Sequence, residues 1–239
     1  MILGVNQPYF IPYLGYWQLI NAVDTFIIAD DYKYIMRGWI NRNRILSGDK
    51  YFGLEIKSAS RNSFINELYI NDFLANTKLK TIYHTYHKAP YFEEGYSLVK
   101  EILTNEERNL SLFLSDSIKL ICKHIGIETA ILKTSDFAGN IELKRERKIY
   151  DLCKRMKADS YYNAAGGQKL YSYKDFENQG IRLGFIKTRN IRYEQFNKEF
   201  EPNLSIIDVI MFNDINRIKE FLKEFDLIEN GGVDNEQSR

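Results

Sequence analysis

Hydrophobic segments that predict strands alternate with segments that predict helices along most of this chain. In the opening, a strand at "ILGV", an aromatic loop, a helix at "GYWQLINAV" and a second strand at "TFIIAD" predict a βαβ unit. Such alternation favours one sheet with helices packed on it over separate layers of helices and strands. We therefore predict an α/β fold with a Rossmann-like, mostly parallel sheet and helical additions.

The later elements follow from hydrophobic spacing in the same way. A third strand is predicted at 51–57. Two core-facing helices are predicted from the stripes Leu79, Ile82, Tyr83, Tyr86 and Phe113, Ser117, Ile118, Ile121, Ile125, the second ending at Gly126. Beyond them we expect a helix around Leu152, a strand at "DSYYN", a Gly-Gly loop, a brief helix, a strand at "IRLGFIKT", and helices at "LSIIDVIMF" and "INRIKEFLKEF". Residues 1–228 are expected to form a single domain, and 229–239, which lack an apolar anchor, a disordered tail.

Charge and composition limit the possible partners. Thirty-three basic and thirty-two acidic side chains leave a formal charge of +1, so any basic site must be local. The start of the chain lacks a signal-peptide pattern and no apolar run is long enough to span a bilayer, so we expect a cytoplasmic protein without a membrane partner. Cys122 and Cys153 fall on apolar helix faces and are expected to be buried thiols.

The loop "QPYFIPYLGYW" lies where open parallel sheets bind ligands, between the first strand and the first helix. Its prolines restrict the backbone, and Gly15 should let the start of the helix approach a ligand closely. Gln7, Tyr9, Tyr13 and Tyr16 are further candidate substrate-binding residues, with the tyrosines stacking on a base or sugar. The alternative is that the aromatic residues only seal the edge of the core.

The same opening resembles nucleotidylyltransferase-type Rossmann-like domains, in which a strand, a proline-containing loop, a His-x-Gly-His signature and a helix follow at similar spacing. The corresponding residues here are "YLGY", so Tyr13 and Tyr16 replace both histidines. This resemblance implies a shared topology. The replacement disfavours adenylylation with ATP and magnesium.

A second candidate region is "ADDYKYIMRGWINRNRI". Asp30 and Asp31 follow the second strand, and the candidates beyond them are Tyr34, Trp39, Asn41, Arg42, Asn43 and Arg44. Arginine suits phosphate and the aromatic rings suit a base or hexose, so the composition favours a sugar nucleotide. A single-stranded nucleic acid uses the same residue types, and a solvated loop with a structural tryptophan is the other alternative. The two aspartates could also bind a divalent cation, but adjacent strand residues point to opposite faces, so a shared metal would require the strand to have ended before them and is disfavoured.

Three further regions carry candidates. His84 lies with Lys80, His87 and Lys88 on one face of a predicted helix, which is either an anion site with a histidine base or a solvated basic face. Asn163, Gly166 and Gly167 follow a strand, where a glycine pair can present backbone N–H groups to an anion or simply form a turn. Ser205 is expected to cap a helix, with Asp208 in its first turn.

These stretches together resemble the WbqC-like family along nearly the whole chain. The matching motifs are "QPYFIPYLGYWQLINAVDTFIIADD", "YIMRGWINRNRI", "KAPYF", "YYNAAGG" and "FEPNLSIIDVIMFN". The family occurs with genes for O-antigen and other bacterial surface polysaccharides, and its members have been suggested to be glycine transferases acting on sugars. The resemblance carries Gln195 into the candidate substrate-binding set.

The expected function is therefore a transferase that attaches an aminoacyl or acyl group, with glycyl as the leading candidate, to the amino group of a nucleotide-linked amino sugar. Asp30 or Asp31 would orient or deprotonate the amine, with His84 as a second candidate base. The donor would be an aminoacyl-tRNA, a carrier thioester or, less favoured, an adenylate made from ATP. The alternatives are a non-catalytic nucleotide- or glycan-binding module of a polysaccharide-assembly complex and an RNA-binding protein.

Overall fold

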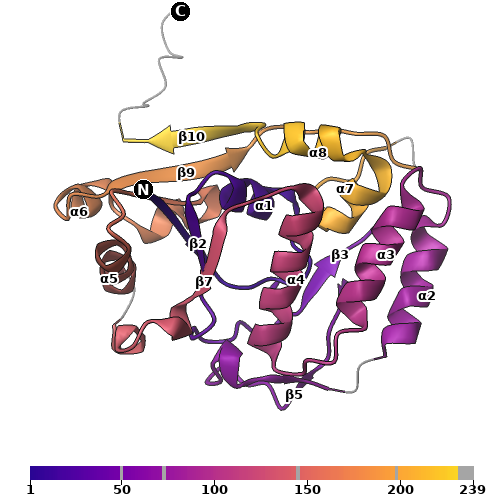
Figure 1. Cartoon of the computed structure of the whole chain (residues 1–239), viewed down its shortest axis with the longest axis horizontal. Helices are drawn as coiled ribbons and strands as arrows, with labels where there is room; N and C mark the ends of the chain where they lie inside the picture. Colours follow the sequence, from indigo (N-terminus) through magenta and orange to yellow (C-terminus); the bar gives the residue numbers. More distant parts are fainter. Residues whose placement is uncertain (49–50, 72–73, 144–145, 197–198, 231–239) are drawn as a thin grey trace, which may run out of the picture.

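The computed structural model describes residues 1–48, 51–71, 74–143, 146–196 and 199–230. In this part of the chain a mixed sheet has the strand order β10-β9-β8-β1-β2-β7, and every strand runs parallel to its neighbours except β10 (Figure 1). The strands are β1 Ile2–Asn6, β2 Thr25–Ile28, β7 Ala130–Lys133, β8 Ser160–Ala164, β9 Arg182–Thr188 and β10 Phe225–Glu229. The predicted α/β, Rossmann-like sheet is confirmed.

Helices cover both faces of this sheet (Figure 1). They are α1 Leu14–Asn21, α2 Ala75–Tyr86, α3 Phe92–Leu103, α4 Leu110–Ile125, α5 Glu146–Met156, α6 Tyr173–Glu177, α7 Ile206–Phe212 and α8 Ile215–Phe221. Strand side chains alternate between the faces, so Leu3 and Val5 pack with α5 and α6 in one core, whereas Phe26 and Ile28 pack with the other helices in a larger one. No helix in the described residues is long and apolar enough to cross a bilayer.

The strand predicted at 51–57 is wrong as a single element. It divides into β4 (Tyr51–Gly53), which pairs with β3 (Arg42–Arg44), and β5 (Ile56–Lys57), which pairs with β6 (Tyr69–Ile70). Both pairs are antiparallel and lie outside the main sheet. Local hydrophobicity identified extended chain here, but it did not show that the two halves pair with different flanking strands, one before and one after this segment.

The end of the chain also differs from the prediction. Helix α8 ends at Phe221, and β10 then pairs antiparallel with β9. Glu229, expected in the tail, is the last residue of β10, while 231–239 lie outside the described residues. The strand was missed because it carries few buried side chains and is defined mainly by its hydrogen-bonded partner.

Other local predictions have mixed outcomes. Gly126 ends α4 with a φ of 75°, a conformation that glycine adopts at low cost, as predicted. Cys122 and Cys153 are buried, and burial raises the pKa of each thiol to about 12. Tyr83, predicted to face the core, is 47 % exposed. The expected Gly-Gly loop is a short 3-10 helix over Ala165–Leu170.

Candidate functional site

The parallel strands end at one edge of the sheet, and the chain changes direction between β1 and β8. Strand β2 lies on one side of β1, whereas β8 returns to the other side. The pairing of β1 with β8 extends only to Gly4 and Tyr162, although β1 continues to Asn6 and β8 to Ala164. Open α/β sheets bind ligands outside the carboxyl ends of their strands at such a switch point. A ligand site is therefore expected along this edge.

Three segments distant in sequence meet at the opening loop. The Asn43 Nδ2 donates to the carbonyl oxygens of Phe10 and Ile11 at 3.3 and 3.0 Å. The Ser205 Oγ also donates to the Ile11 carbonyl, at 2.7 Å, and Ser205 caps α7 as predicted. Ile11 has a φ of 40°, so these donors hold the loop in a conformation that isoleucine adopts rarely. Asn43, predicted to bind substrate, is 3 % exposed and fixes the loop instead.

The aromatic residues of the loop divide between core and surface. Phe10, Tyr16 and Trp17 are buried, and the Tyr16 hydroxyl donates to the Gln7 carbonyl at 3.0 Å. The prediction that Tyr16 contacts substrate is therefore wrong, because its ring fills the core beneath α1. Tyr9 and Tyr13 are partly exposed. The Gln7 side chain donates to the Lys33 carbonyl at 3.3 Å, which joins the two predicted ligand loops.

The Gly15 Cα lies close to side chains of the protein itself, so there is no open space where a Cβ atom would be. A Cβ atom at this position would lie 2.6 Å from the Thr188 Oγ1 and 2.6 Å from the ring of Tyr13. The predicted close approach of the helix to a ligand stays a prediction, and the two groups that a Cβ would meet both line the pocket described below. The glycine lets α1 pack against β9.

Gly15→Ala should lower the free energy of unfolding by about 1–3 kcal/mol, because backbone and side chains must shift to admit the methyl group. Denaturant titration monitored by circular dichroism measures this change. Gly166→Ala is the matched control, since a Cβ there meets nothing within 4 Å. Equal stability of the Gly15→Ala variant and the wild type would contradict the close packing of α1 on β9.

A cavity of about 180 Å³ lies beyond the carboxyl end of β9, and we call it the edge pocket. Tyr13, Thr188, Asn190, Tyr193, Phe200 and Pro202 are among the residues that line it. The rings of Tyr193 and Phe200 meet edge to face with centroids 5.1 Å apart. Burial raises the pKa of the Tyr13 hydroxyl, so this group stays protonated at neutral pH and can donate a hydrogen bond.

Behind the pocket lies a buried carboxylate without a cationic partner among the described residues. The Asp208 Oδ1 accepts from the Tyr86 hydroxyl at 2.9 Å, and its Oδ2 accepts from the Tyr193 hydroxyl and the Gln195 amide, each at 2.7 Å. Burial raises the pKa of Asp208. Gln195 was predicted to bind substrate. Its side-chain oxygen accepts from the Glu201 N–H at 2.8 Å, so it supports the pocket wall from behind.

Arg44 lies at the margin of the edge pocket. Its guanidinium pairs with Glu201, which stands between the pocket residues Phe200 and Pro202. Arg42 leaves the same face of β3, two residues away, and its guanidinium lies 4.0 Å from the ring centroid of Tyr51. The two arginines predicted to bind a pyrophosphate thus share a strand face, but each already has a partner.

The other predicted residues of that loop have different positions. The Tyr34 hydroxyl donates to the Asn41 Oδ1 at 2.7 Å, and the Asn41 Nδ2 donates to the Leu54 carbonyl at 2.7 Å, so both residues hold the loop against β4. Trp39 is 45 % exposed and meets Tyr51 edge to face at 6.0 Å. The Trp39 ring is therefore far more exposed than that of Tyr34, which is 5 % exposed.

Asp30 and Asp31 lie beyond the end of β2 at Ile28, so strand alternation does not apply to them, and both carboxylates contact one hydroxyl. Asp30 faces α4, where its Oδ2 accepts from the Ser111 hydroxyl at 2.9 Å and from the Ser135 hydroxyl at 2.8 Å. The Thr134 hydroxyl lies 3.0 Å from Asp30 and 2.5 Å from Asp31. Asp30 is 1 % exposed and both its oxygens have donors, so it acts here as a structural acceptor.

Lys148 is a buried residue that the sequence interpretation missed. Its Nζ lies 2.7 Å from the Asp31 Oδ1 and 4.5 Å from the ring centroid of Tyr32, and the lysine and aspartate side chains are 4 % and 3 % exposed. Lys148 precedes Leu152 by four residues and so shares the apolar face of α5. In the sequence, a lysine at a position of the apolar stripe of this helix could have indicated a buried, paired cation.

The remaining candidates lie apart from the edge pocket. Asn163 is the last residue but one of β8, and there its Oδ1 accepts from the Ala164 N–H at 2.7 Å and its Nδ2 donates to the Tyr161 hydroxyl at 3.2 Å. Gly166 is exposed and Gly167 half-buried. His84 lies on the exposed face of α2, which packs on α3. No group of three or more His, Cys, Asp or Glu side chains in the described ranges is placed to hold a metal ion.

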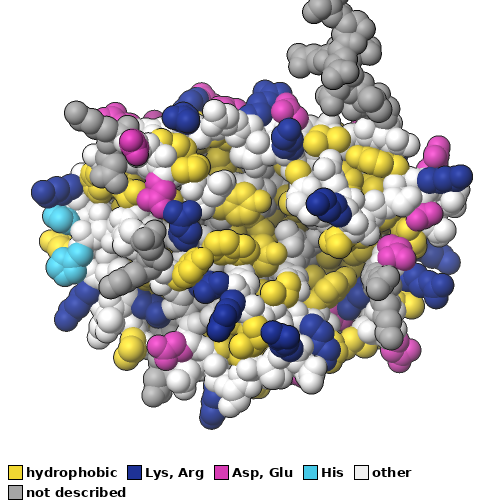
Figure 2. Space-filling view, turned by 180° about the vertical axis from the view of Figure 1, so that it is seen from behind, with side chains coloured by type: hydrophobic (Ala, Val, Ile, Leu, Met, Phe, Trp, Pro, Cys, Tyr) yellow, Lys and Arg dark blue, Asp and Glu magenta, His cyan; other side chains and the backbone are white. Residues whose placement is uncertain are grey.

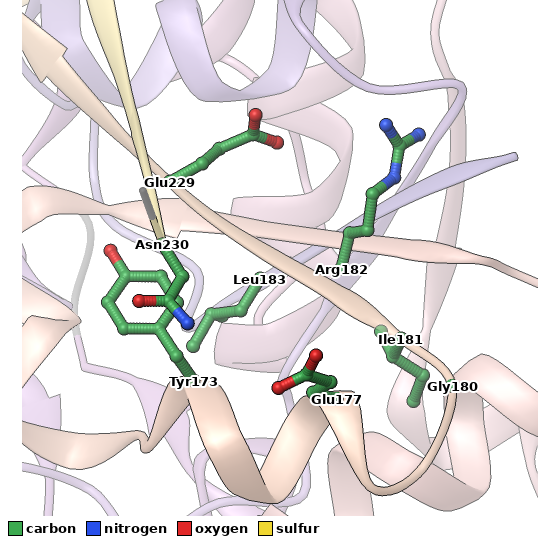
Figure 3. A pocket seen from close by; sticks show the side chains of 8 residues that line it. All are labelled: Tyr173, Glu177, Gly180, Ile181, Arg182, Leu183, Glu229 and Asn230. Carbon is green, nitrogen blue, oxygen red and sulfur yellow. The ribbon is translucent and has the colours of Figure 1, made fainter. Parts of the chain in front are cut away.

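A larger cavity, of about 280 Å³, lies at the opposite edge of the sheet (Figure 3). Arg182 and Leu183 at the start of β9 line it, with Tyr173 and Glu177 of α6 and Glu229 at the end of β10. It contains none of the predicted site residues. Because ligands of such sheets bind at the carboxyl ends of the strands, we favour the smaller edge pocket.

Comparison with known proteins assigns the chain to a family. The model of the WbqC-like protein family matches residues 7–220, which include every segment at the edge pocket. The chain belongs to the WbqC-like protein family. A WbqC-like relative, "Uncharacterized protein Rv1507c" of Mycobacterium tuberculosis, is 28 % identical over 217 residues, which cover 88 % of this chain and 93 % of the relative. No solved structure matches the chain.

Proposed function

We propose that this WbqC-like protein is a transferase that attaches an activated aminoacyl or acyl group, with glycyl as the leading candidate, to the amino group of a nucleotide-linked amino sugar in the assembly of a surface polysaccharide. The acceptor binds along the carboxyl edge of the sheet. The donor is activated, as an aminoacyl-tRNA or a carrier thioester, because amide formation from a free carboxylate is unfavourable in water.

The composition of the edge pocket carries this proposal. Tyr13, Tyr193 and Phe200 line a cavity large enough for one ring system, and Arg189 lies in its wall. Aromatic faces stack on a base or sugar, and guanidinium groups pair with phosphate. Arg189 and its partner Asp226 are both more than half exposed, so a phosphate can displace this ion pair at little cost.

The proposed base lies further along the same edge. Asp31 follows β2, three residues beyond its end at Ile28, and β2 is three strand spacings from β9, or about 14 Å. An extended ligand with a base, a pyrophosphate and a sugar can bridge that distance, so that its amine reaches the Asp31–Lys148 pair. His84, on exposed α2, lies apart from this pair and from the pocket and takes no part in the proposal.

A non-catalytic nucleotide- or glycan-binding module is the second candidate. The saturation of Asp30 by hydroxyl and backbone donors favours it, because this carboxylate has no free oxygen to accept a proton from an amine. Under this alternative the edge pocket binds the same ligand, but no transfer follows.

Thermal stabilisation by a ligand panel tests the proposal. The panel contains nucleoside diphosphates, nucleotide-linked amino sugars, ATP with magnesium, and short RNA. We expect one nucleotide-linked amino sugar to raise the Tm more than its bare nucleotide does. Tyr13→Ala should abolish most of that increase, whereas Tyr83→Ala, on exposed α2, should leave it unchanged.

Either of two results would count against the proposal. Equal stabilisation by the amino sugar nucleotide and the bare nucleotide would remove the sugar as a ligand. Stabilisation that survives in the Tyr13→Ala variant would place the ligand outside the edge pocket. A ligand that binds as expected but accepts no acyl group from any activated donor would favour the binding module.

A further inference from the structure

The loop that follows β2 presents aromatic and cationic side chains together. Residues 32–48 contain no acidic residue. We define the basic-aromatic surface as Lys33, Arg37, Trp39 and Arg42 of this segment together with Tyr51 of β4 and Arg61, all of them exposed except the half-buried Arg42. The lower part of Figure 2, on the side of the molecule that carries β5 in Figure 1, shows several Lys and Arg side chains among hydrophobic ones.

The aromatic part of this surface is held in a fixed arrangement. Trp39 and Tyr51 are 45 % and 50 % exposed, and their rings meet edge to face at 6.0 Å. The Arg42 Nε donates to the Gly38 carbonyl at 3.1 Å, its terminal nitrogen donates to the Arg37 carbonyl, and its guanidinium stacks on Tyr51. Exposed rings placed in advance lose little conformational entropy when a ligand stacks on them.

Among the described residues, the cations of this surface have no acidic partners. Within the ranges that the structure describes, no carboxylate lies within ion-pair distance of Lys33, Arg37, Arg42 or Arg61, whereas ion pairs engage arginines elsewhere. Lys33 instead donates to the Asn62 carbonyl and lies over the Phe64 ring. A chain with a formal charge of +1 thus concentrates unpaired positive charge beside exposed rings.

We propose that the basic-aromatic surface binds single-stranded RNA, with bases stacked against Trp39 and Tyr51 and phosphates paired with the surrounding cations. Proteins that bind single strands combine these two features. Membrane-surface binding ordinarily uses one long amphipathic helix, whereas these residues come from a loop and a short strand pair. The observations therefore favour a polynucleotide over a lipid surface.

The basic-aromatic surface lies close to the edge pocket, which indicates an aminoacyl-tRNA as the donor. This assignment of the donor rests on the proposed function. Arg42 belongs to the surface, and Arg44 on the same face of β3 lies at the pocket margin. The unpaired 3′ end of an aminoacyl-tRNA bound here would direct its aminoacyl ester toward the acceptor. The acceptor amine attacks the ester carbonyl, a C–N bond forms, the C–O bond to the ribose breaks, and the proton lost by nitrogen ends on the ribose hydroxyl of the released tRNA.

Fluorescence anisotropy with a labelled single-stranded RNA of about twelve nucleotides ending in CCA, and with a duplex of the same sequence, tests the binding. We expect the single strand to bind more tightly than the duplex and its affinity to fall as salt rises. Trp39→Ala and Arg42→Ala should each weaken binding by about tenfold or more. Arg217→Ala, which removes an exposed arginine of α8, should change neither affinity nor Tm.

Absence of RNA binding at low salt, equal affinity for the duplex, or unchanged affinity in the Trp39→Ala variant would overturn the proposal. Binding to anionic vesicles that needs Trp39, without RNA binding, would instead assign the surface to a membrane. These results can be distinguished from a failure of the proposed function. RNA binding without transfer from aminoacyl-tRNA keeps the surface and rejects the donor, whereas transfer from a thioester without RNA binding keeps the transferase and rejects the surface.

Discussion

Replacing Lys148 with methionine should lower the free energy of unfolding by about 3–5 kcal/mol. The lysine Nζ lies 2.7 Å from the Asp31 Oδ1, and both side chains are almost fully buried. Methionine fills a similar volume but leaves the Asp31 carboxylate without its cation in a region where water does not solvate it. Urea denaturation of the variant and the wild type, with equal m-values, measures the difference.

Two further variants separate the ion pair from its neighbours. Lys154→Met removes an exposed lysine from the same helix and should cost less than about 0.5 kcal/mol. Combining Lys148→Met with Asp31→Leu should recover part of the stability, since no buried charge is then left unpaired. A Lys148→Met variant as stable as its Lys154→Met control would show that the pair is solvated in solution.

Asp208→Ala should cost about 3 kcal/mol or more. The change leaves the hydroxyls of Tyr86 and Tyr193 and the amide of Gln195 without their acceptor, and each buried donor left unpaired costs about 1–3 kcal/mol. The same change frees the Tyr193 ring, so it should also weaken the ligand-induced rise in Tm. Val209→Ala, one residue further along α7, gives the cost of truncating a buried side chain that makes no such hydrogen bonds.

Asp208→Asn should change how stability depends on pH. Because burial raises the pKa of Asp208, the folded protein binds this proton more tightly than the unfolded chain does. The stability that this proton contributes is present below the ordinary aspartate pKa and is lost as the pH rises through the raised value. Asparagine does not titrate, so relative to wild type the variant should become more stable as pH increases above about 4. A constant difference across that range would contradict the raised pKa.

Hydrophobic periodicity along the chain determined most of the fold. The opening βαβ unit, the cap of α4 at Gly126 and the capping of α7 by Ser205 depend on residues close in sequence, and all three are observed. Local sequence patterns are enough to predict a helix or strand when its stability comes from its own backbone hydrogen bonds and from the burial of one face.

Only the tertiary structure decided which candidate residues face a ligand. The sequence placed Tyr16, Asn43 and Gln195 in the binding set because polar and aromatic residues occurred in the right loops, yet each is buried and serves the protein itself. Lys148 and Asp31 are 117 residues apart in the sequence, and no local pattern predicts that the fold brings them into contact. A hydrogen-bonding side chain binds whichever partner the fold brings near it, so its role depends on long-range packing that residue type and spacing do not specify.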